Sequence, residues 1–189
     1  MSTNTIINGT DYGPLACLVG TWTGKKGNDL APEPDGDENT AYSETLAFEA
    51  IGDVTNAEKQ TLAVLRYHQI VYRLSDNCPI HNETGYWHWD AETDIVMQTL
   101  AIPRGVCLLA GGKVDRHISG QETAIEVVAS DGDPEWGITQ SPFMQQKART
   151  LSFYHKLSVK GDQLSYTETT VVDIYGKRFD HIDSNVLTR

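Results

Sequence analysis

The residue best suited to coordination chemistry is His181, which lies in a short predicted strand near the end of the sequence. Side chains two apart in a strand point the same way, so Phe179 and His181 share one face, and Arg178 and Asp180 share the other. A face that carries Phe179 is expected to turn inwards. An imidazole on a rigid strand is the usual proximal ligand of haem, although a buried histidine bonded to a neighbour is the more frequent occurrence.

His81 is the second candidate, because a period-two pattern puts it on one face with Glu83 and Gly85. That face is expected to line the same cavity as His181, with surface placement as the open alternative. The other four histidines have no spacing that would assemble a zinc site, so they are interpreted as solvated or structural. They are His68, His88, His117 and His155.

Motifs for catalysis by side chains alone are largely absent. The sequence has no G-x-S-x-G nucleophile motif, no H-E-x-x-H zinc motif and no G-x-x-x-x-G-K-[ST] phosphate loop. Asp35, Asp37 and Asn39 resemble part of a calcium loop, but the glycine and the late glutamate of such a loop are missing. Any chemistry is therefore expected to come from a bound cofactor.

The element that must position His181 is a C-terminal hairpin. Its first strand has a period-two face formed by Leu164, Tyr166, Thr170, Val172 and Ile174. Tyr175 and Gly176 then reverse the chain into a second strand, which contains His181. A terminal strand needs a partner, and closure of a sheet into a barrel supplies one without leaving a bare edge. We therefore expect His181 to point into a barrel cavity.

Strand-like segments recur along the rest of the sequence, separated by turn residues such as Gly52-Asp53 and Gly161-Asp162. They are Thr21 to Thr23, Tyr42 to Ile51, Lys59 to Leu74, Ile80 to Trp89, Asp94 to Ala101, Val106 to Gly111, Glu122 to Ser130, Thr150 to Lys160, Gln163 to Ile174 and Lys177 to Thr188. This series predicts an all-β, single-domain protein (residues 1–189) that forms an antiparallel up-and-down barrel of about ten strands. A two-sheet sandwich is the alternative.

Three segments are expected to lie outside the regular strands. Pro14 to Gly20 predicts a short helix that plugs the barrel, and Pro142 to Lys147 predicts a second helical piece. Residues 28–39 are rich in Asp, Glu, Pro and Gly, which predicts a solvated loop.

The composition excludes some partners. With 189 residues, a formal charge of -11 and a pI near 4.8, the protein would be repelled by nucleic acids and anionic membranes. The sequence contains no apolar stretch of about 20 residues and no signal-peptide pattern. Three widely spaced cysteines, Cys17, Cys78 and Cys107, indicate reduced thiols, so a cytoplasmic location is expected.

Four motifs, in the same order, resemble those of the nitrobindin family of haem-binding β-barrels, which have a fatty-acid-binding-protein-like, or lipocalin-like, fold. They are the opening Pro14-Leu15-Ala16-Cys17-Leu18-Val19-Gly20-Thr21-Trp22-Thr23-Gly24, the strand Pro79-Ile80-His81-Asn82-Glu83-Thr84-Gly85-Tyr86, the strand Gly161-Asp162-Gln163-Leu164-Ser165-Tyr166, and the closing His181-Ile182. The opening departs from the family's G-x-W-x-G-x-G at Lys26, which replaces the last glycine, with Gly27 one place later.

The resemblance implies a ten-stranded barrel that holds one b-type haem in an apolar pocket, with the iron bound by His181. It also implies that His81 lies in the pocket and that Gly20, Trp22 and Gly24 belong to the cofactor-binding motif. For the family, ferric haem is associated with nitric oxide binding and with the isomerisation of peroxynitrite to nitrate, so a peroxynitrite isomerase activity is the enzymatic expectation.

Two other functions stay open. A carrier of a fatty acid or another apolar molecule would need an arginine inside the barrel, and Arg66 is the mid-strand candidate, because Arg178 is followed by Phe179 and Asp180 rather than by the R-x-Y pair of fatty-acid-binding proteins. A scaffold for other proteins is supported only by the acidic segment. The sequence leaves the oligomeric state open, with a homodimer among the alternatives.

Overall fold

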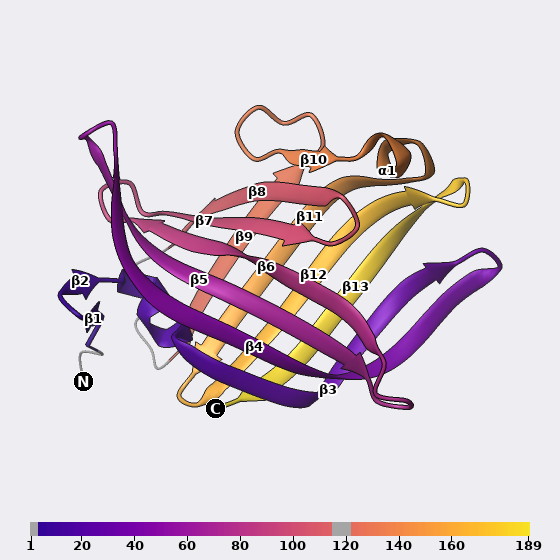
Figure 1. Ribbon diagram of the computed structural model, residues 1–189, viewed down its shortest axis with the longest axis horizontal. Helices are drawn as coiled ribbons and strands as arrows, with labels where there is room; N and C mark the ends of the chain where they lie inside the picture. Colours follow the sequence, from indigo (N-terminus) through magenta and orange to yellow (C-terminus); the bar gives the residue numbers. More distant parts are fainter. Residues whose placement is uncertain (1–3, 115–121) are drawn as a thin grey trace.

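The structure, a computed structural model that describes residues 4–114 and 122–189, is dominated by one antiparallel sheet that closes on itself (Figure 1). Its ten barrel strands are β3 (Gly20–Glu33), β4 (Gly36–Asn56), β5 (Gln60–Arg73), β6 (Pro79–Asp90), β7 (Ile95–Ile102), β8 (Val106–Lys113), β9 (Glu122–Ser130), β11 (Ala148–Lys160), β12 (Gln163–Ile174) and β13 (Lys177–Thr188). The predicted all-β barrel is thus confirmed, and the sandwich alternative is wrong.

The order of the strands around the barrel follows the sequence almost completely. From β3 to β8 each strand pairs with the next, β13 pairs back onto β3, and β9 lies beside β11. The ring closes between β8 and β9, where Gly111 is the partner of Val128. An additional short strand, β10 (Ile138–Gln140), pairs with the start of β8 and leads into the helix α1 (Pro142–Lys147). The predicted helical piece at Pro142 to Lys147 is confirmed.

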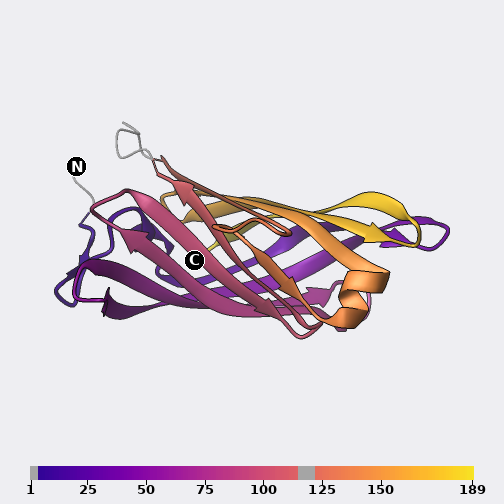
Figure 2. The same cartoon turned by 90° about the horizontal axis from the view of Figure 1, so that it is seen from above.

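The end of the barrel nearest the N-terminus is closed by packed side chains. A two-residue strand pair, β1 (Ile6–Ile7) and β2 (Thr10–Asp11), precedes the 3-10 helix η1 (Gly13–Leu18), which confirms the predicted N-terminal helix. Figure 2 shows this end and α1 at opposite ends of the molecule. Among the described residues, no helix is long and apolar enough to span a membrane.

Trp22 is at the centre of this closed end. Its side chain is fully buried, as are Leu15 and Leu18 of η1. The indole Nε1 donates a hydrogen bond of 2.6 Å to the backbone oxygen of Leu18, which fastens η1 to β3. The guanidinium of Arg189 lies 4.3 Å from the centre of the indole ring, a distance at which a cation is attracted to the ring face.

The prediction of a solvated loop at residues 28–39 is wrong. β3 and β4 stay paired from Asn28, opposite Ala41, to Glu33, opposite Gly36, and only the turn at residues 34 and 35 is irregular. The two strands project beyond the barrel as a long hairpin (Figure 1). Pairing with a neighbouring strand has overridden the loop-like composition, and Asp35, Asp37 and Asn39, which resemble part of a calcium loop, lie along this hairpin.

The C-terminal hairpin forms as predicted, from Gln163 to Thr188. Tyr175 and Gly176 both have positive φ, 55° and 75°, as expected for the two central residues of a tight type I′ turn. The turn fixes the register of β12 against β13, so that Thr170 pairs with His181. His181 thereby lies two residues before Asp183, which pairs with Asp29 of β3.

Candidate functional site

The barrel encloses a cavity of about 700 Å³ at the end opposite η1. It is lined by the end of β3, the start of β4, the end of β5 and the start of β6, and by the β12–β13 hairpin and α1. A volume of this size is typical of sites for small molecules and cofactors. The walls include the apolar residues Val71, Ile80, Leu100, Ile102, Val106, Leu108, Phe143, Met144, Phe153, Val172 and Ile174.

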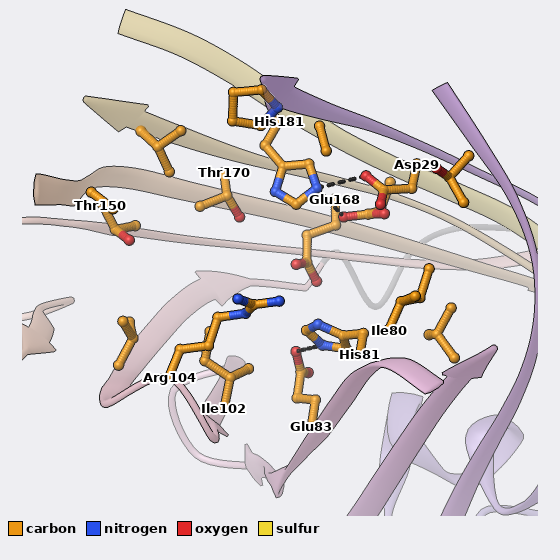
Figure 3. A pocket seen from close by; sticks show the side chains of 18 of the residues that line it. Asp29, Ile80, His81, Glu83, Ile102, Arg104, Thr150, Glu168, Thr170 and His181 are labelled. Carbon is orange, nitrogen blue, oxygen red and sulfur yellow. Dashed lines mark hydrogen bonds and ion pairs between the residues drawn. The ribbon is translucent and has the colours of Figure 1, made fainter. Parts of the chain in front are cut away.

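His181 lines this cavity, as predicted, but its ring is already engaged (Figure 3). The Nε2 atom lies 2.7 Å from Oδ1 of Asp29 and 3.5 Å from Oδ2 of Asp183. Burial opposes the charged imidazole, but the bond to Asp29 and the charges of Asp183 and Asp29 outweigh burial and raise the pKa of His181. The ring nitrogen that usually binds a metal thus faces two carboxylates.

His81 lines the cavity on another strand, across from His181 (Figure 3). Its Nε2 lies 3.2 Å from Glu83, whose side chain is only 1% exposed. The Tyr67 hydroxyl donates to the other oxygen of Glu83 at 2.5 Å, and Gln98 donates to that hydroxyl at 3.0 Å. The amide oxygen of Gln98 in turn accepts from Nδ1 of His155 at 3.0 Å. A directed hydrogen-bond chain therefore runs from the cavity into the core.

Acidic side chains also line the cavity, beside the apolar walls that the family resemblance implies. Burial, followed by the charges of Glu83, Asp183 and Glu44, raises the pKa of Glu168 well above its usual range. Burial likewise raises the pKa of Asp183 to about 6, with the charge of Asp29 adding to the effect and that of His181 opposing it. Carboxylates packed this closely favour a bound cation or bound protons.

Glu44 lies below the floor and is satisfied by protein donors. Its carboxylate accepts hydrogen bonds from the Tyr166 hydroxyl at 2.8 Å, from Asn185 at 2.9 Å and from Gln69 at 3.0 Å. Burial nevertheless raises the pKa of Glu44 above its ordinary value, because the three donors only partly offset the loss of water. This network joins β4, β5, β12 and β13 and rigidifies the wall below the cavity.

Gly20, Trp22 and Gly24 do not line the cavity and lie at the closed end. Gly20, with φ of 128°, lies close to the Arg189 side chain, and a Cβ at Gly24 would come within 2.7 Å of the backbone oxygen of Val186. Gly24 therefore allows the close approach of β13, whereas the positive φ of Gly20 favours glycine there. His181 and His81 thus line the same cavity. The residues of the opening motif instead pack the closed end of the barrel.

Of the remaining histidines, the three in the described part of the chain have the structural or solvated positions that the sequence predicts. His155 is buried between Trp87, Phe153 and Tyr166, whereas His68 is exposed. His88 lies on β6, where its side chain is partly buried. His117 lies outside the described residues.

The sequence interpretation missed the acidic residues around His181. Glu168 lies on the same period-two face as Tyr166 and Thr170, and Asp183 is two residues from His181, so the alternation already placed both inside. Asp29 had no such signal, because it was assigned to a loop and meets His181 only through the pairing of β3 with β13.

A closed barrel with a histidine-lined cavity defines a small-ligand-binding protein. Residues 11–189 match the model of the THAP4-like, heme-binding beta-barrel domain. The chain belongs to this family, which confirms the nitrobindin resemblance. The fold is also similar to that of Rv2717c from M. tuberculosis, whose crystal structure aligns with a TM-score of 0.68 and 23% identity over 93% of this chain and 94% of that chain. No curated protein matches the sequence.

Haem, the group that the family implies, fits the cavity under one condition. The apolar walls suit a flat macrocycle, and Arg73 has a buried Nε with no hydrogen-bond partner among the described residues, which suits a propionate. His181 provides an imidazole on the wall. The condition is that the Asp29 carboxylate leaves Nε2, because that atom cannot bind both a proton shared with Asp29 and an iron ion.

Proposed function

We propose that this protein binds one b-type haem in the cavity, with His181 as the axial ligand. The observation that carries the proposal is the imidazole of His181 on the wall of a cavity of about 700 Å³, in a member of a haem-binding family. Arg73, which also lines the cavity and has a buried Nε without a partner among the described residues, would pair with a propionate.

When bound, ferric haem would supply an open coordination position for small ligands, and we propose nitric oxide binding and peroxynitrite isomerisation on the basis of the family resemblance. The protein's own contribution lies across the cavity from His181, where Figure 3 shows His81 and Arg104. Glu83 holds the His81 ring in place. His81 and Arg104 would orient an anionic ligand through hydrogen bonds and positive charge.

The test is a titration of the apoprotein with ferric haem. We expect a Soret band that saturates at one haem per chain, loss of that band in His181→Ala, and its retention in His81→Ala, since His81 is held by Glu83 on the opposite wall. A band of equal intensity and position in His181→Ala would reject the ligand assignment. Circular dichroism of each variant checks that it is folded.

Asp29→Asn is expected to tighten haem binding, because the substitution removes the carboxylate that holds Nε2 of His181. A hydrogen bond to a charged group contributes about 1.5 kcal/mol or more, so the dissociation constant should fall roughly tenfold. Asp37→Asn, on the same projecting hairpin, is the matched control and should leave the constant unchanged. Weaker binding in Asp29→Asn would instead show that the carboxylate supports the ligand.

A carrier of an apolar carboxylate is the second candidate function, and the buried unpartnered Nε of Arg73 favours it. Arg66, the arginine expected from the sequence, is exposed and pairs with Glu49, so it does not serve the cavity. Native mass spectrometry of the protein as purified separates the two functions. A bound lipid mass, together with no haem uptake, would favour the carrier.

A further inference from the structure

We infer that Asp29, His181 and Asp183 form a binding site for a single divalent transition-metal ion, which would occupy His181 in place of haem iron. One ligand atom from each residue lies within 4.8 Å of the other two. Metal bonds of about 2.0–2.2 Å to nitrogen and oxygen place neighbouring donors roughly 3 to 3.5 Å apart. The Nε2 of His181 is 3.5 Å from Asp183, which already suits a shared ion, and 2.7 Å from Asp29, which would move outwards to admit one.

The strand register holds the donors together before any ion binds. Asp183 on β13 and Asp29 on β3 are direct cross-strand partners. Like charges in this arrangement destabilise a sheet, and a cation between them removes the repulsion. The His181 side chain lies on the same face as Asp183, two residues before it. The side chains are 18%, 27% and 31% exposed for Asp29, Asp183 and His181, so an ion in the cavity can reach all three.

Glu168 is a third acidic side chain beside these residues. It is the cross-strand partner of Asp183, its side chain is only 14% exposed, and it points into the cavity beside His181 (Figure 3). Within residues 4–114 and 122–189, no group donates a hydrogen bond to its carboxyl. The nearest basic atom is Nδ1 of His155 at 3.7 Å, and that atom already binds Gln98.

The charge of the whole cavity points the same way. Its lining contains six acidic side chains against two arginines, Arg73 and Arg104, and two histidines, His81 and His181, and Arg73 is already paired with Asp76. The carboxylates are Asp29, Glu33, Glu38, Glu83, Glu168 and Asp183. A field of this sign concentrates cations in the cavity.

The donor set selects the class of ion. One imidazole nitrogen with two carboxylate oxygens suits zinc, manganese, iron(II) or cobalt(II), whereas calcium and magnesium prefer oxygen donors alone. Three protein ligands also leave at least one coordination position open to the cavity. Because the ion would occupy Nε2 of His181, it would exclude an iron–His181 bond, and the two occupants should compete.

The experiment is a titration of chelator-treated apoprotein with Co²⁺, followed by its visible absorption and by calorimetry. We expect a d–d band that saturates at one ion per chain and that Zn²⁺ displaces. Asp183→Asn should weaken binding at least tenfold. Asp180→Asn, an exposed position on the opposite face of β13, should bind like the wild type. Binding that is absent, or equally tight in Asp183→Asn, would overturn the proposal.

Two further variants keep the result interpretable. Asp29→Asn should also weaken Co²⁺ binding, while it tightens haem binding, so opposite effects of one substitution identify the two occupants. If Asp183→Asn proves unfolded by circular dichroism, Asp29→Asn decides the metal proposal alone. A Soret band without Co²⁺ binding would reject the metal site and retain the haem proposal. Co²⁺ binding without a Soret band would reject the haem proposal and retain the metal site.

Discussion

Trp22→Ala is expected to lower the free energy of unfolding by about 3 to 5 kcal/mol, the usual effect of truncating a buried tryptophan. The indole is fully buried, holds η1 through its bond to Leu18, and stacks against Arg189. The substitution should leave haem binding to the folded fraction unchanged, because Trp22 does not line the cavity. Urea denaturation and a haem titration measure the two effects.

Val54→Ala is the control for Trp22→Ala. Val54 is 45% exposed, so its truncation should change the free energy of unfolding by no more than about 0.5 kcal/mol. A folded Trp22→Ala variant that no longer takes up haem would contradict the structural role and return this residue to the cofactor site, as the family resemblance implied.

The second large expected effect is a loss of folding stability at low pH, which we attribute to His155. Burial lowers the pKa of His155 to about 4, while in the unfolded chain it is near 6.5. The unfolded state therefore binds a proton first as the pH falls, and the folded state loses stability between about pH 6.5 and pH 4. At about 1.4 kcal/mol per pKa unit, the loss reaches roughly 3 kcal/mol.

His155→Gln removes this titration. At pH 7 the variant should be less stable than the wild type, because it loses ring packing against Trp87 and Tyr166. The stability gap should shrink by roughly 3 kcal/mol on going to pH 4. His68→Gln, at an exposed position, should follow the wild-type curve. Urea unfolding at several pH values measures the difference, and parallel curves for wild type and His155→Gln would contradict the prediction.

Local patterns predicted most of the barrel. The bounds of β9, β12, β13 and α1 are those expected from the sequence, because turns such as Tyr175-Gly176 have strong residue preferences that mark where strands end. β10 was missed because a three-residue strand is too short for a period to appear. Its pairing with β8 depends on contacts between distant parts of the chain.

The candidate site was predicted only in part, for a related reason. Alternation along β13 and β6 indicated His181 and His81, and the same alternation could have indicated Glu168 and Asp183. The role of Asp29 could not be predicted, because the Asp, Glu, Pro and Gly residues around it indicate a loop. Its partner, His181, is more than 150 positions away in sequence. Tertiary pairing, rather than local propensity, decided that segment.

The separation of the packed end around Trp22 from the open end around His181 has a practical consequence for protein engineering. Exposed residues at the mouth, such as Phe143 and Tyr175, can be exchanged to admit synthetic metalloporphyrins or fluorescent dyes with little loss of thermal tolerance, because the tryptophan anchor is remote from them. A library confined to these positions would sample new guests while the scaffold stays intact.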